Sequence, residues 1–302
     1  HLKKLSPDFL VGYYSDNFDL PYLKARAEEH KVRLSLGLDG SEPKFSRGIE
    51  LTGKIKGIVH IDLLRFIRTA YSQYMQSETM RLDDVATEFL GEGKKEHKFK
   101  HSSKIKEDEW ESFFEYNLHD SFLVFKLFEK MWPDILEFSR IIQEPVFEVS
   151  RNGMSKNVES YILHNLERFD EIPEKKPMNE EISKRMHMGK YEGAFVFEPI
   201  PGIYEDIAVF DFTSCYGSTI VTYNLSKSTF LEKPEKNSYS IETPEGKLHF
   251  SKEKGFFPEM LSEIIDKRKK YKQEYKKSPS GITKARSNAY KLLANASYGY
   301  QG

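Results

Sequence analysis

Hydrophobic and polar positions in the first 140 residues predict strands that alternate with helices. The apolar stretch 9–14 (Phe-Leu-Val-Gly-Tyr-Tyr) is typical of a buried strand, and a turn and a helix beginning near Pro21 follow it. Residues 58–63 predict a second strand. From Trp110 to Met131 the apolar positions recur at helical spacing, which predicts a long amphipathic helix. Strands that alternate with helices indicate an α/β layer.

The pattern changes after residue 140. Residues 141–190 are polar and rich in predicted helix, and their charged run 171–176 is typical of a solvated face or a linker. At 208–212 the order Ala-Val-Phe-Asp-Phe predicts a short apolar strand interrupted by one carboxylate. Residues 239–251 predict hairpin segments around a Pro-Glu-Gly turn.

The last block predicts a helical hairpin. One helix begins with Pro258 near its first turn and runs to about Lys277, where Ser-Pro-Ser-Gly breaks the pattern. A second helix is predicted from Thr283 to about Tyr298. No internal repeat is visible in the sequence.

Length and composition are those of a soluble globular protein. The 302 residues allow two or three domains, with 38% apolar and 31% charged residues and a formal net charge of -1. The single cysteine, Cys215, excludes an internal disulfide and favours a reducing cytoplasm. No apolar run approaches the roughly 20 residues that span a bilayer, so we expect no membrane partner. The sequence begins at His1 rather than at an initiator methionine, so we expect a truncated chain.

Basic residues are concentrated in the predicted hairpin. Between 267 and 291 there are ten basic residues and one acidic residue, Glu274. Arg268 and Lys272 are four positions apart and share a helical face, as do Lys291 and Asn295 on the second helix. If the helices pack antiparallel, these faces can converge into a cradle for a polyphosphate. Composition alone leaves two other readings open, a solvated basic helix and a helix that binds a nucleic-acid backbone.

Asp211 interrupts the apolar segment 208–212. An unpaired carboxylate is costly to bury, so this side chain is expected to be paired, to lie at a strand end or to bind a metal ion. A cap of a turn is the alternative that residue type alone leaves open.

The order of residues in the second helix is more specific than its composition. Lys291-Leu-Leu-Ala-Asn295-Ala-Ser-Tyr298-Gly resembles the fingers signature K-x-x-x-N-S-x-Y-G of family B DNA polymerases. The resemblance implies that Lys291 and Asn295 contact the phosphates of the incoming nucleotide and that Tyr298 packs near the nascent base pair. It implies further triphosphate ligands at Arg268 and Lys272 and another basic residue, facing DNA, at Arg286. Ala296 stands where the family has Ser.

Residues 211–220 (Asp-Phe-Thr-Ser-Cys-Tyr-Gly-Ser-Thr-Ile) resemble the palm signature D-x-x-S-L-Y-P-S-I-I of the same family. The resemblance implies that catalytic Asp211 and the backbone carbonyl of Phe212 bind two divalent ions. Tyr216 would pack under the deoxyribose and exclude a 2′-hydroxyl. Hard cations prefer oxygen ligands, which favours Mg²⁺ as the cofactor. Cys215 and Gly217 depart from the pattern, and Gly217 loosens a turn that Pro would fix.

Two further motifs resemble the exonuclease domain of archaeal-type family B enzymes. Residues 11–23 resemble its second motif, in which Asp19 matches a metal-binding carboxylate, whereas Tyr14 stands where the family usually has Asn. Tyr116-Asn-Leu-His-Asp120 resembles the third motif, Y-x-x-x-D. The spacing puts Tyr116 and Asp120 on one helical face, where the phenol could orient water and the carboxylate could hold a metal. The first motif would precede His1, so we expect weak or no exonuclease activity.

Tyr191-Glu-Gly193-Ala-Phe resembles the Y-x-G-G/A motif that contacts the template strand in this family, which implies DNA contacts at Tyr191 and Gly193. The motif precedes Asp211 by 20 residues, a spacing that favours the functional interpretation.

The ordered motifs together imply an α/β chain, α+β overall, in four parts. These are a partial RNase H-like 3′-5′ exonuclease domain (1–140), a helical connection (141–190), the first part of the palm (191–255) and a fingers helical hairpin (256–302).

The resemblance implies a DNA-directed DNA polymerase, as a fragment or a split subunit. Its partners would be primer-template DNA, dNTPs and a C-terminal segment that carries the second palm aspartates and the thumb. A catalytically inactive DNA-binding subunit is the alternative. A nuclease acting alone is less favoured, because its motifs are the more depleted.

Overall fold

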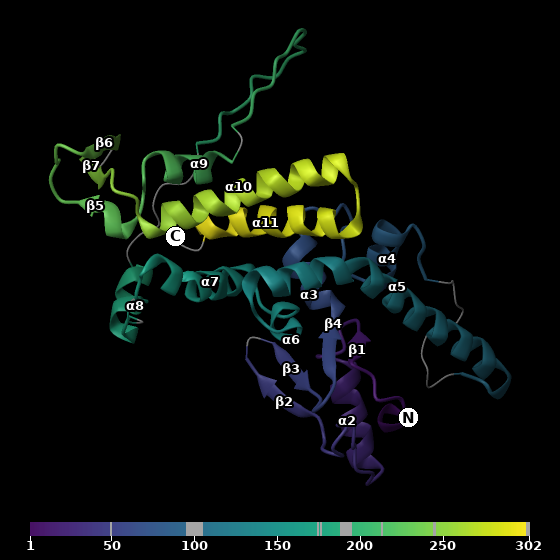
Figure 1. Ribbon diagram of the computed structural model, residues 1–302. Coiled ribbons are helices and arrows are strands. Elements are labelled where there is room, and N and C mark those ends of the chain that lie inside the picture. Colours follow the sequence, from purple (N-terminus) through teal and green to yellow (C-terminus); the bar gives the residue numbers. More distant parts are fainter. Residues whose placement is uncertain are drawn as a thin grey trace. The chain divides into compact units, whose positions relative to one another are not determined.

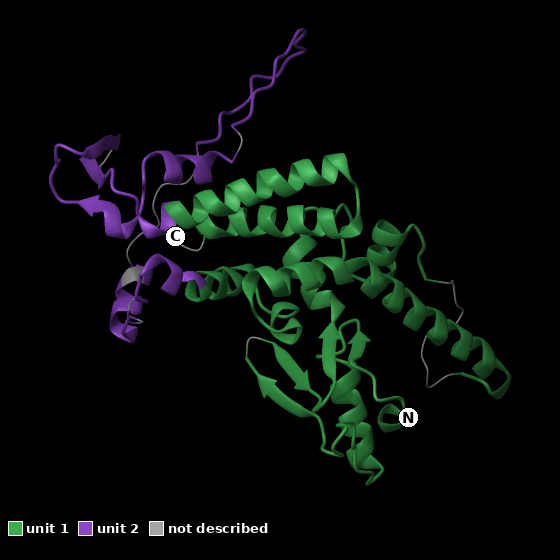
Figure 2. Cartoon of the chain, viewed as in Figure 1, with its two compact units in different colours: residues 1–164, 259–302 green, residues 165–258 purple. Residues whose placement is uncertain are grey.

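The computed structural model of the protein describes residues 1–48, 50–94, 105–173, 175, 177–187, 195–212, 214–243 and 246–299 (Figure 1). The chain divides into two compact units, one made of residues 1–164 and 259–302 and the other of residues 165–258 (Figure 2). Each unit is described by itself. Helices and strands occur in both, so the predicted mixed α and β class is confirmed.

Two short strand pairs organise the first unit. β1 (Phe9–Gly12) pairs in parallel with β4 (Val59–Asp62), and β2 (Lys44–Arg47) pairs antiparallel with β3 (Leu51–Lys54). Both strands predicted in this region, near 9–14 and 58–63, are therefore present. Parallel pairing needs a long crossover, which the chain provides between β1 and β4. The N-terminal helices and short helical segments of this unit are α1 (Leu2–Leu5), α2 (Asp19–Glu29), α3 (Leu63–Tyr71), α4 (Leu82–Leu90) and η2 (Glu107–Glu109).

The long helix α5 (Trp110–Ile142) forms the centre of the hydrophobic core. Its buried face includes Leu123, Leu127 and Met131, which cluster with residues of β4 and α3. The helix extends beyond the predicted end at Met131 and continues through Pro133. Proline removes one helical hydrogen bond, but Ile135, Phe138 and Ile142 continue the buried stripe and hold the helix together.

Helices α6 (Val146–Val149) and α7 (Met154–Asn165) follow α5, and the predicted helical hairpin closes the unit. It consists of α10 (Phe256–Lys277) and α11 (Gly281–Gly299), which lie side by side in Figure 1. The rings of Tyr271 and Tyr290 stack between the helices at 5.4 Å. Ser280 begins the second helix, since its hydroxyl accepts a hydrogen bond from the Thr283 amide at 3.1 Å. The predicted hairpin is confirmed.

The second unit is smaller. Its sheet is antiparallel in the order β5-β7-β6, with Ser238 of β6 opposite Ser251 of β7, so the hairpin predicted at 239–251 is confirmed. Asn224 anchors the end of this sheet because its side-chain amide donates to the Ser251 carbonyl at 2.8 Å. The elements of this unit are η3 (Glu167–Phe169), α8 (Asn179–His187), α9 (Cys215–Thr222), η4 (Lys227–Thr229), β5 (Phe230–Leu231), β6 (Ser238–Thr243) and β7 (Gly246–Ser251).

The prediction of a strand at 208–212 is wrong. These residues form no strand, and the side chains of Val209, Phe210 and Phe212 are 88%, 92% and 83% exposed. A strand needs a neighbour to satisfy its backbone groups and to cover its apolar side chains. No strand within the described ranges pairs with this segment. The sequence pattern indicated apolar character correctly but could not reveal whether a partner lies beside it.

Among the described residues, no helix combines the length and the apolar character that a membrane span needs.

Candidate nucleotide and metal sites

Helix α11 carries Lys291 and Asn295 one turn apart, as predicted. The Lys291 ammonium lies 4.1 Å from the centre of the Tyr74 ring, a cation–π contact with the segment that follows α3. Asn295 and Tyr298 line a cavity of about 160 Å³. The other residues that line it include Gln73, Tyr74, Met154 and Leu292. Tyr74 and Gln73 were missed by sequence reasoning, because they lie more than 200 residues from α11 and carry no motif.

Arg268 and Lys272 lie on α10 at the same helical spacing. Lys272 is exposed and Arg268 is half-buried. The Tyr271–Tyr290 stack fixes the two helices at this level. The role of both cations as phosphate ligands stays a prediction.

Arg286 has an internal partner. Its Nε donates to Oε2 of Glu137 on α5 at 3.0 Å, and that carboxylate is buried. This hydrogen bond is the main cause that raises the pKa of Arg286. Arg140 also pairs with this carboxylate, with its Nη1 atom 2.8 Å from Oε1 of Glu137. The pair therefore attaches α11 to α5, and a DNA contact by Arg286 stays a prediction.

Asp211 and Phe212 belong to the second unit and precede α9. Both are exposed, so the Asp211 carboxylate avoids the desolvation cost expected for a buried strand position. Tyr216 on α9 is 58% exposed, whereas Gly217 beside it is buried. The basic hairpin lies in the first unit, and the positions of the two units relative to one another are not determined.

The donor chemistry of this segment fits a hard divalent cation. The Asp211 carboxylate and the Phe212 carbonyl are oxygen donors of the kind Mg²⁺ prefers, and both lie in an exposed segment. Within the described ranges, no three His, Cys, Asp or Glu side chains form a group that could hold a metal ion. Further ligands would have to come from elsewhere.

The turn before Asp19 is held by a buried polar network. Asp16 is fully buried and its carboxylate accepts hydrogen bonds from Arg151 Nε at 2.9 Å and from the Gly53 amide at 2.8 Å. Burial would raise the pKa of Asp16, but hydrogen bonds from His60 and Arg151 outweigh it and hold that pKa well below its usual range. Sequence reasoning missed this network.

Tyr14, the residue that departs from the second exonuclease motif, has a left-handed backbone with φ 64°. Its amide donates to Oδ1 of buried Asp62 at 2.8 Å, which holds the turn. Asparagine is enriched several-fold in this conformation, so the usual residue of the motif suits the backbone better than tyrosine does. Asp19 begins α2, and burial raises the pKa of its carboxyl.

Tyr116 and Asp120 share a face of α5, as the spacing predicted. A residue that the motif did not include joins them: the Lys94 ammonium donates to Asp120 Oδ2 at 2.6 Å and to the Tyr116 hydroxyl at 3.1 Å. Asp19 and Asp120 are not part of a metal-binding group of three within the described residues. Metal binding by Asp19 and Asp120 stays a prediction.

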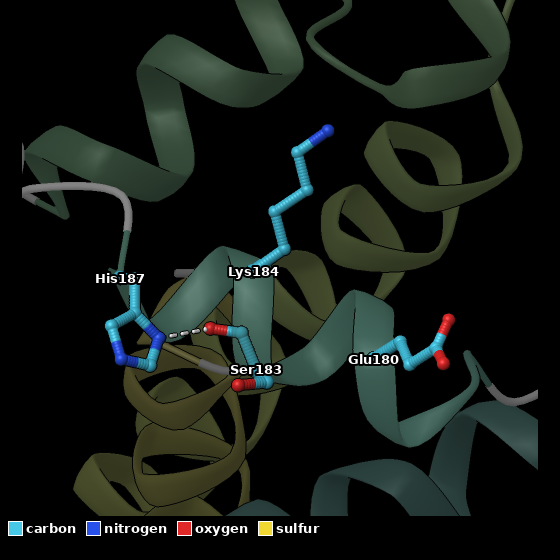
Figure 3. Close-up of a pocket in the computed structure, with 4 residues that line it drawn as sticks. All are labelled: Glu180, Ser183, Lys184 and His187. Atoms are coloured by element: carbon cyan, nitrogen blue, oxygen red, sulfur yellow. Dashed lines mark hydrogen bonds between the residues drawn. The ribbon is translucent and has the colours of Figure 1, made fainter.

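Two other features need separate mention. The template motif, Tyr191 and Gly193, falls outside the described residues. A hollow of about 590 Å³ lies against α8, where Glu180, Ser183, Lys184 and His187 line it (Figure 3). His187 Nδ1 donates to the Ser183 carbonyl at 2.6 Å, one turn back on the same helix. This bond is internal to α8, and the described residues that line the hollow include none of the predicted site residues.

Two family models match the chain. The sequence profile of DNA polymerase family B matches residues 145–302, and the profile of the family's exonuclease domain matches residues 1–84. The chain therefore belongs to DNA polymerase family B.

Its relatives include archaeal enzymes. "DNA polymerase 1" of Pyrococcus abyssi is 33% identical over 312 residues, covering 100% of this chain and 39% of the relative. "DNA polymerase" of Thermococcus sp. (strain 9oN-7) is 32% identical with the same shares. The solved family B DNA polymerase of the hyperthermophilic archaeon Pyrobaculum calidifontis superposes with a TM-score of 0.78 at 29% identity, covering 100% of this chain and 40% of that one. The chain thus spans about 39% of the length of these curated relatives.

Proposed function

We propose that this chain forms the nucleotide-gripping part of a DNA-directed DNA polymerase, which adds dNTPs to the 3′-hydroxyl of a primer on template DNA. The observation that carries the proposal is the pair Lys291 and Asn295, one turn apart on the second helix of a basic hairpin. A point charge and an amide donor at this spacing suit two neighbouring phosphate oxygens. Arg268 and Lys272 would add cations from α10, and Tyr298 would pack near the nascent base pair.

Binding a triphosphate requires Lys291 to leave the Tyr74 ring. Tyr74 is 45% exposed, and a cation–π contact at an exposed site is worth about 0.5–1 kcal/mol. A hydrogen bond between an ammonium and a charged oxygen contributes about 1.5–3 kcal/mol. The phosphate contact is the stronger of the two, so a bound triphosphate can draw the Lys291 ammonium away from the Tyr74 ring.

In the palm portion, Asp211 and the Phe212 carbonyl would hold divalent ions, which we propose to be Mg²⁺. Such ions, when bound, activate the attacking hydroxyl and stabilise charge on the transferred phosphate. Tyr216 would lie under the sugar and exclude a 2′-hydroxyl, and its exposed position on α9 supports this role. Tyr191, Gly193 and Arg286 would contact DNA.

A C-terminal polymerase segment would complete the palm. Support comes from the apolar stretch 195–212, whose members are exposed in the described structure: Phe195, Val196, Ile203, Val209, Phe210 and Phe212. Exposed apolar side chains in such number are typical of a surface that another element covers. That segment would supply the second palm aspartates and the thumb.

The four-part division of the chain belongs to the same proposal: exonuclease portion 1–140, connection 141–190, palm portion 191–255 and fingers 256–302. Compact packing of residues 165–258 supports a palm portion that packs apart from the rest. We expect little exonuclease activity.

Primer extension with Mg²⁺ and dNTPs tests the proposal, using the chain alone and the chain joined to the C-terminal segment of a family B relative. We expect incorporation only with that segment, and its loss in Asp211→Asn. Incorporation by the chain alone would refute the dependence on a second segment. Failure with the segment, while DNA is still bound, would favour the alternative of a non-catalytic DNA-binding subunit. The lack of a three-residue metal group in the described part of the chain is the observation that keeps this alternative in view.

A further inference from the structure

The exonuclease-like part of the first unit holds a cation of its own. Lys94 follows α4, and its ammonium lies between the two polar side chains of the third motif on α5. The Nζ–Oδ2 distance to Asp120 is 2.6 Å, the Nζ–Oη distance to Tyr116 is 3.1 Å, and Nζ lies 5.5 Å from the centre of the Tyr116 ring. One ammonium therefore uses both groups that the motif offers.

The segment that presents Lys94 is fixed at each residue. The Glu92 carboxylate pairs with Lys126, and the Gly93 carbonyl accepts from Nε2 of His119 at 3.2 Å. The Lys94 amide donates to Oδ1 of Asp83 at 2.6 Å. At Gly93 an added Cβ would lie 2.5 Å from the Asp83 carboxylate, so a larger residue would require that side chain to move. The ammonium is thus placed by a built segment that spans α4 and α5.

The Lys94–Asp120 ion pair is largely shielded from solvent. The Lys94 side chain is 29% exposed and that of Asp120 is 19% exposed. The second Asp120 oxygen, Oδ1, is buried and has no hydrogen-bond partner among the described residues.

We propose that the Lys94 ammonium is a built-in substitute for a divalent cation at Tyr116 and Asp120, and that it keeps Mg²⁺ and Mn²⁺ out of this part of the unit. A metal ion needs the Asp120 carboxylate at about 2.0–2.2 Å, where the ammonium already neutralises it. The Tyr116 hydroxyl already accepts a hydrogen bond from Lys94, which uses one of the lone pairs through which it could orient a water molecule. The third motif is then structural in this chain, and it joins α4 to α5. The inference rests on the assignment of Asp120 to the exonuclease motif.

Mn²⁺ is the probe for a test on the full chain, because it broadens NMR signals only near its binding site. Signals of residues 116–120 are followed in the wild type and in Lys94→Met. The wild type should show no selective broadening there at low Mn²⁺ concentrations. In Lys94→Met, broadening should appear at a roughly tenfold lower concentration, since the competing charge is gone. Lys94→Gln is the second variant if Lys94→Met does not fold.

Matched controls separate the cause. Lys130 lies on α5, as Tyr116 and Asp120 do, and its ammonium donates to the Phe89 carbonyl. Lys130→Met removes this ammonium and should leave the wild-type pattern unchanged. Asp120→Asn added to Lys94→Met should abolish the gain. Selective broadening at 116–120 in the wild type, equal to that in Lys94→Met, would overturn the proposal, as would a folded Lys94 variant that gains no broadening. Triphosphate binding by α11 does not involve Lys94, so a titration with Mg²⁺-dATP reports separately on the proposed function.

Discussion

Lys291 and Lys94 are two of the lysines of the first unit that lie against tyrosine rings, and their surroundings differ in one respect. The Lys291 ammonium lies 4.1 Å from the centre of the Tyr74 ring, and within the described ranges no carboxylate pairs with it. The Lys94 ammonium lies beside Tyr116 and also donates to Asp120. A ring holds an ammonium by about 0.5–1 kcal/mol at an exposed site, whereas a charge-assisted hydrogen bond adds about 1.5–3 kcal/mol.

The difference shows that a lysine beside a tyrosine ring can have two opposite roles. Lys291 is available to an anionic ligand that binds its ammonium more strongly than the Tyr74 ring does. Lys94 has its charge matched by a partly buried carboxylate, so the ammonium and the Asp120 oxygen that it contacts are already paired with each other. The proposed fingers hairpin is therefore expected to respond to nucleotide, and the proposed third exonuclease motif, Tyr116 and Asp120, is expected to remain closed.

The largest effect is expected for the stability of the first unit, in which Asp16 is a buried charged residue. Asp16→Asn leaves Arg151 buried without its charged partner, which is expected to destabilise the first unit by about 3–5 kcal/mol. Urea unfolding of the first unit, followed by NMR signals of β1 and β4, measures this. Asp39→Asn is the matched control, since Asp39 pairs with Lys56 at the surface, and it should change the unfolding midpoint little. Equal effects of the two substitutions would contradict the account.

The same carboxylate gives a pH dependence. Because the pKa of Asp16 is lowered in the folded chain, its contribution to stability is present above the ordinary aspartate range and is lost as pH falls toward the folded value. Acid should therefore destabilise the wild type more than Asp16→Asn. Unfolding midpoints measured between neutral and acidic pH check this, and parallel curves for the two proteins would contradict it.

The next largest effect is expected at Lys291. Lys291→Ala removes a charge-assisted contact to the triphosphate, so the affinity for Mg²⁺-dATP should fall by roughly 10- to 100-fold. Isothermal titration calorimetry measures the change. Lys276→Ala removes an exposed cation from the other helix of the hairpin and should have a much smaller effect. If both substitutions weaken binding equally, the hairpin attracts phosphate by net charge alone.

Tyr74→Ala sharpens the comparison from the other side. Removing the ring abolishes the resting place of Lys291, so triphosphate affinity should rise by roughly two- to fivefold. Tyr74→Phe keeps the face of the ring and should match the wild type. An equal gain in both variants would mean that the hydroxyl, rather than the ring, restrains Lys291.

The smallest effect is expected at Tyr14. Its φ of 64° favours asparagine, so Tyr14→Asn should stabilise the first unit by about 0.5–1 kcal/mol. The substitution also restores the usual residue of the second exonuclease motif, yet Mn²⁺ should still not bind at Asp120 while Lys94 is present. Thermal unfolding and Mn²⁺ broadening check both statements. Tyr22→Asn, at an exposed position inside α2, is the control and should give no gain.

Local pattern sufficed for the elements whose stability is local. The α10–α11 hairpin follows from helical spacing and a Ser-Pro-Ser-Gly break, and α5 from its apolar stripe. Asp16 and Arg151 meet across 135 residues, and Lys94 reaches Asp120 across 26, so neither pair leaves a periodic signal. Segment 208–212 shows the converse limit, since an apolar pattern does not reveal which element covers it. Of the predicted site, the faces of α5 and α11 could be foreseen, but their partners Lys94 and Tyr74 could not.

One NMR titration tests the central comparison most directly. The ring of Tyr74 should shift the ε-methylene protons of Lys291 upfield in the free chain, and Mg²⁺-dATP should move these signals back while those of Lys94 remain in place. If saturating Mg²⁺-dATP leaves the Lys291 signals unmoved, the proposed response of the fingers hairpin is contradicted, and if it moves those of Lys94 as far, the closed state of the Tyr116–Asp120 motif is contradicted.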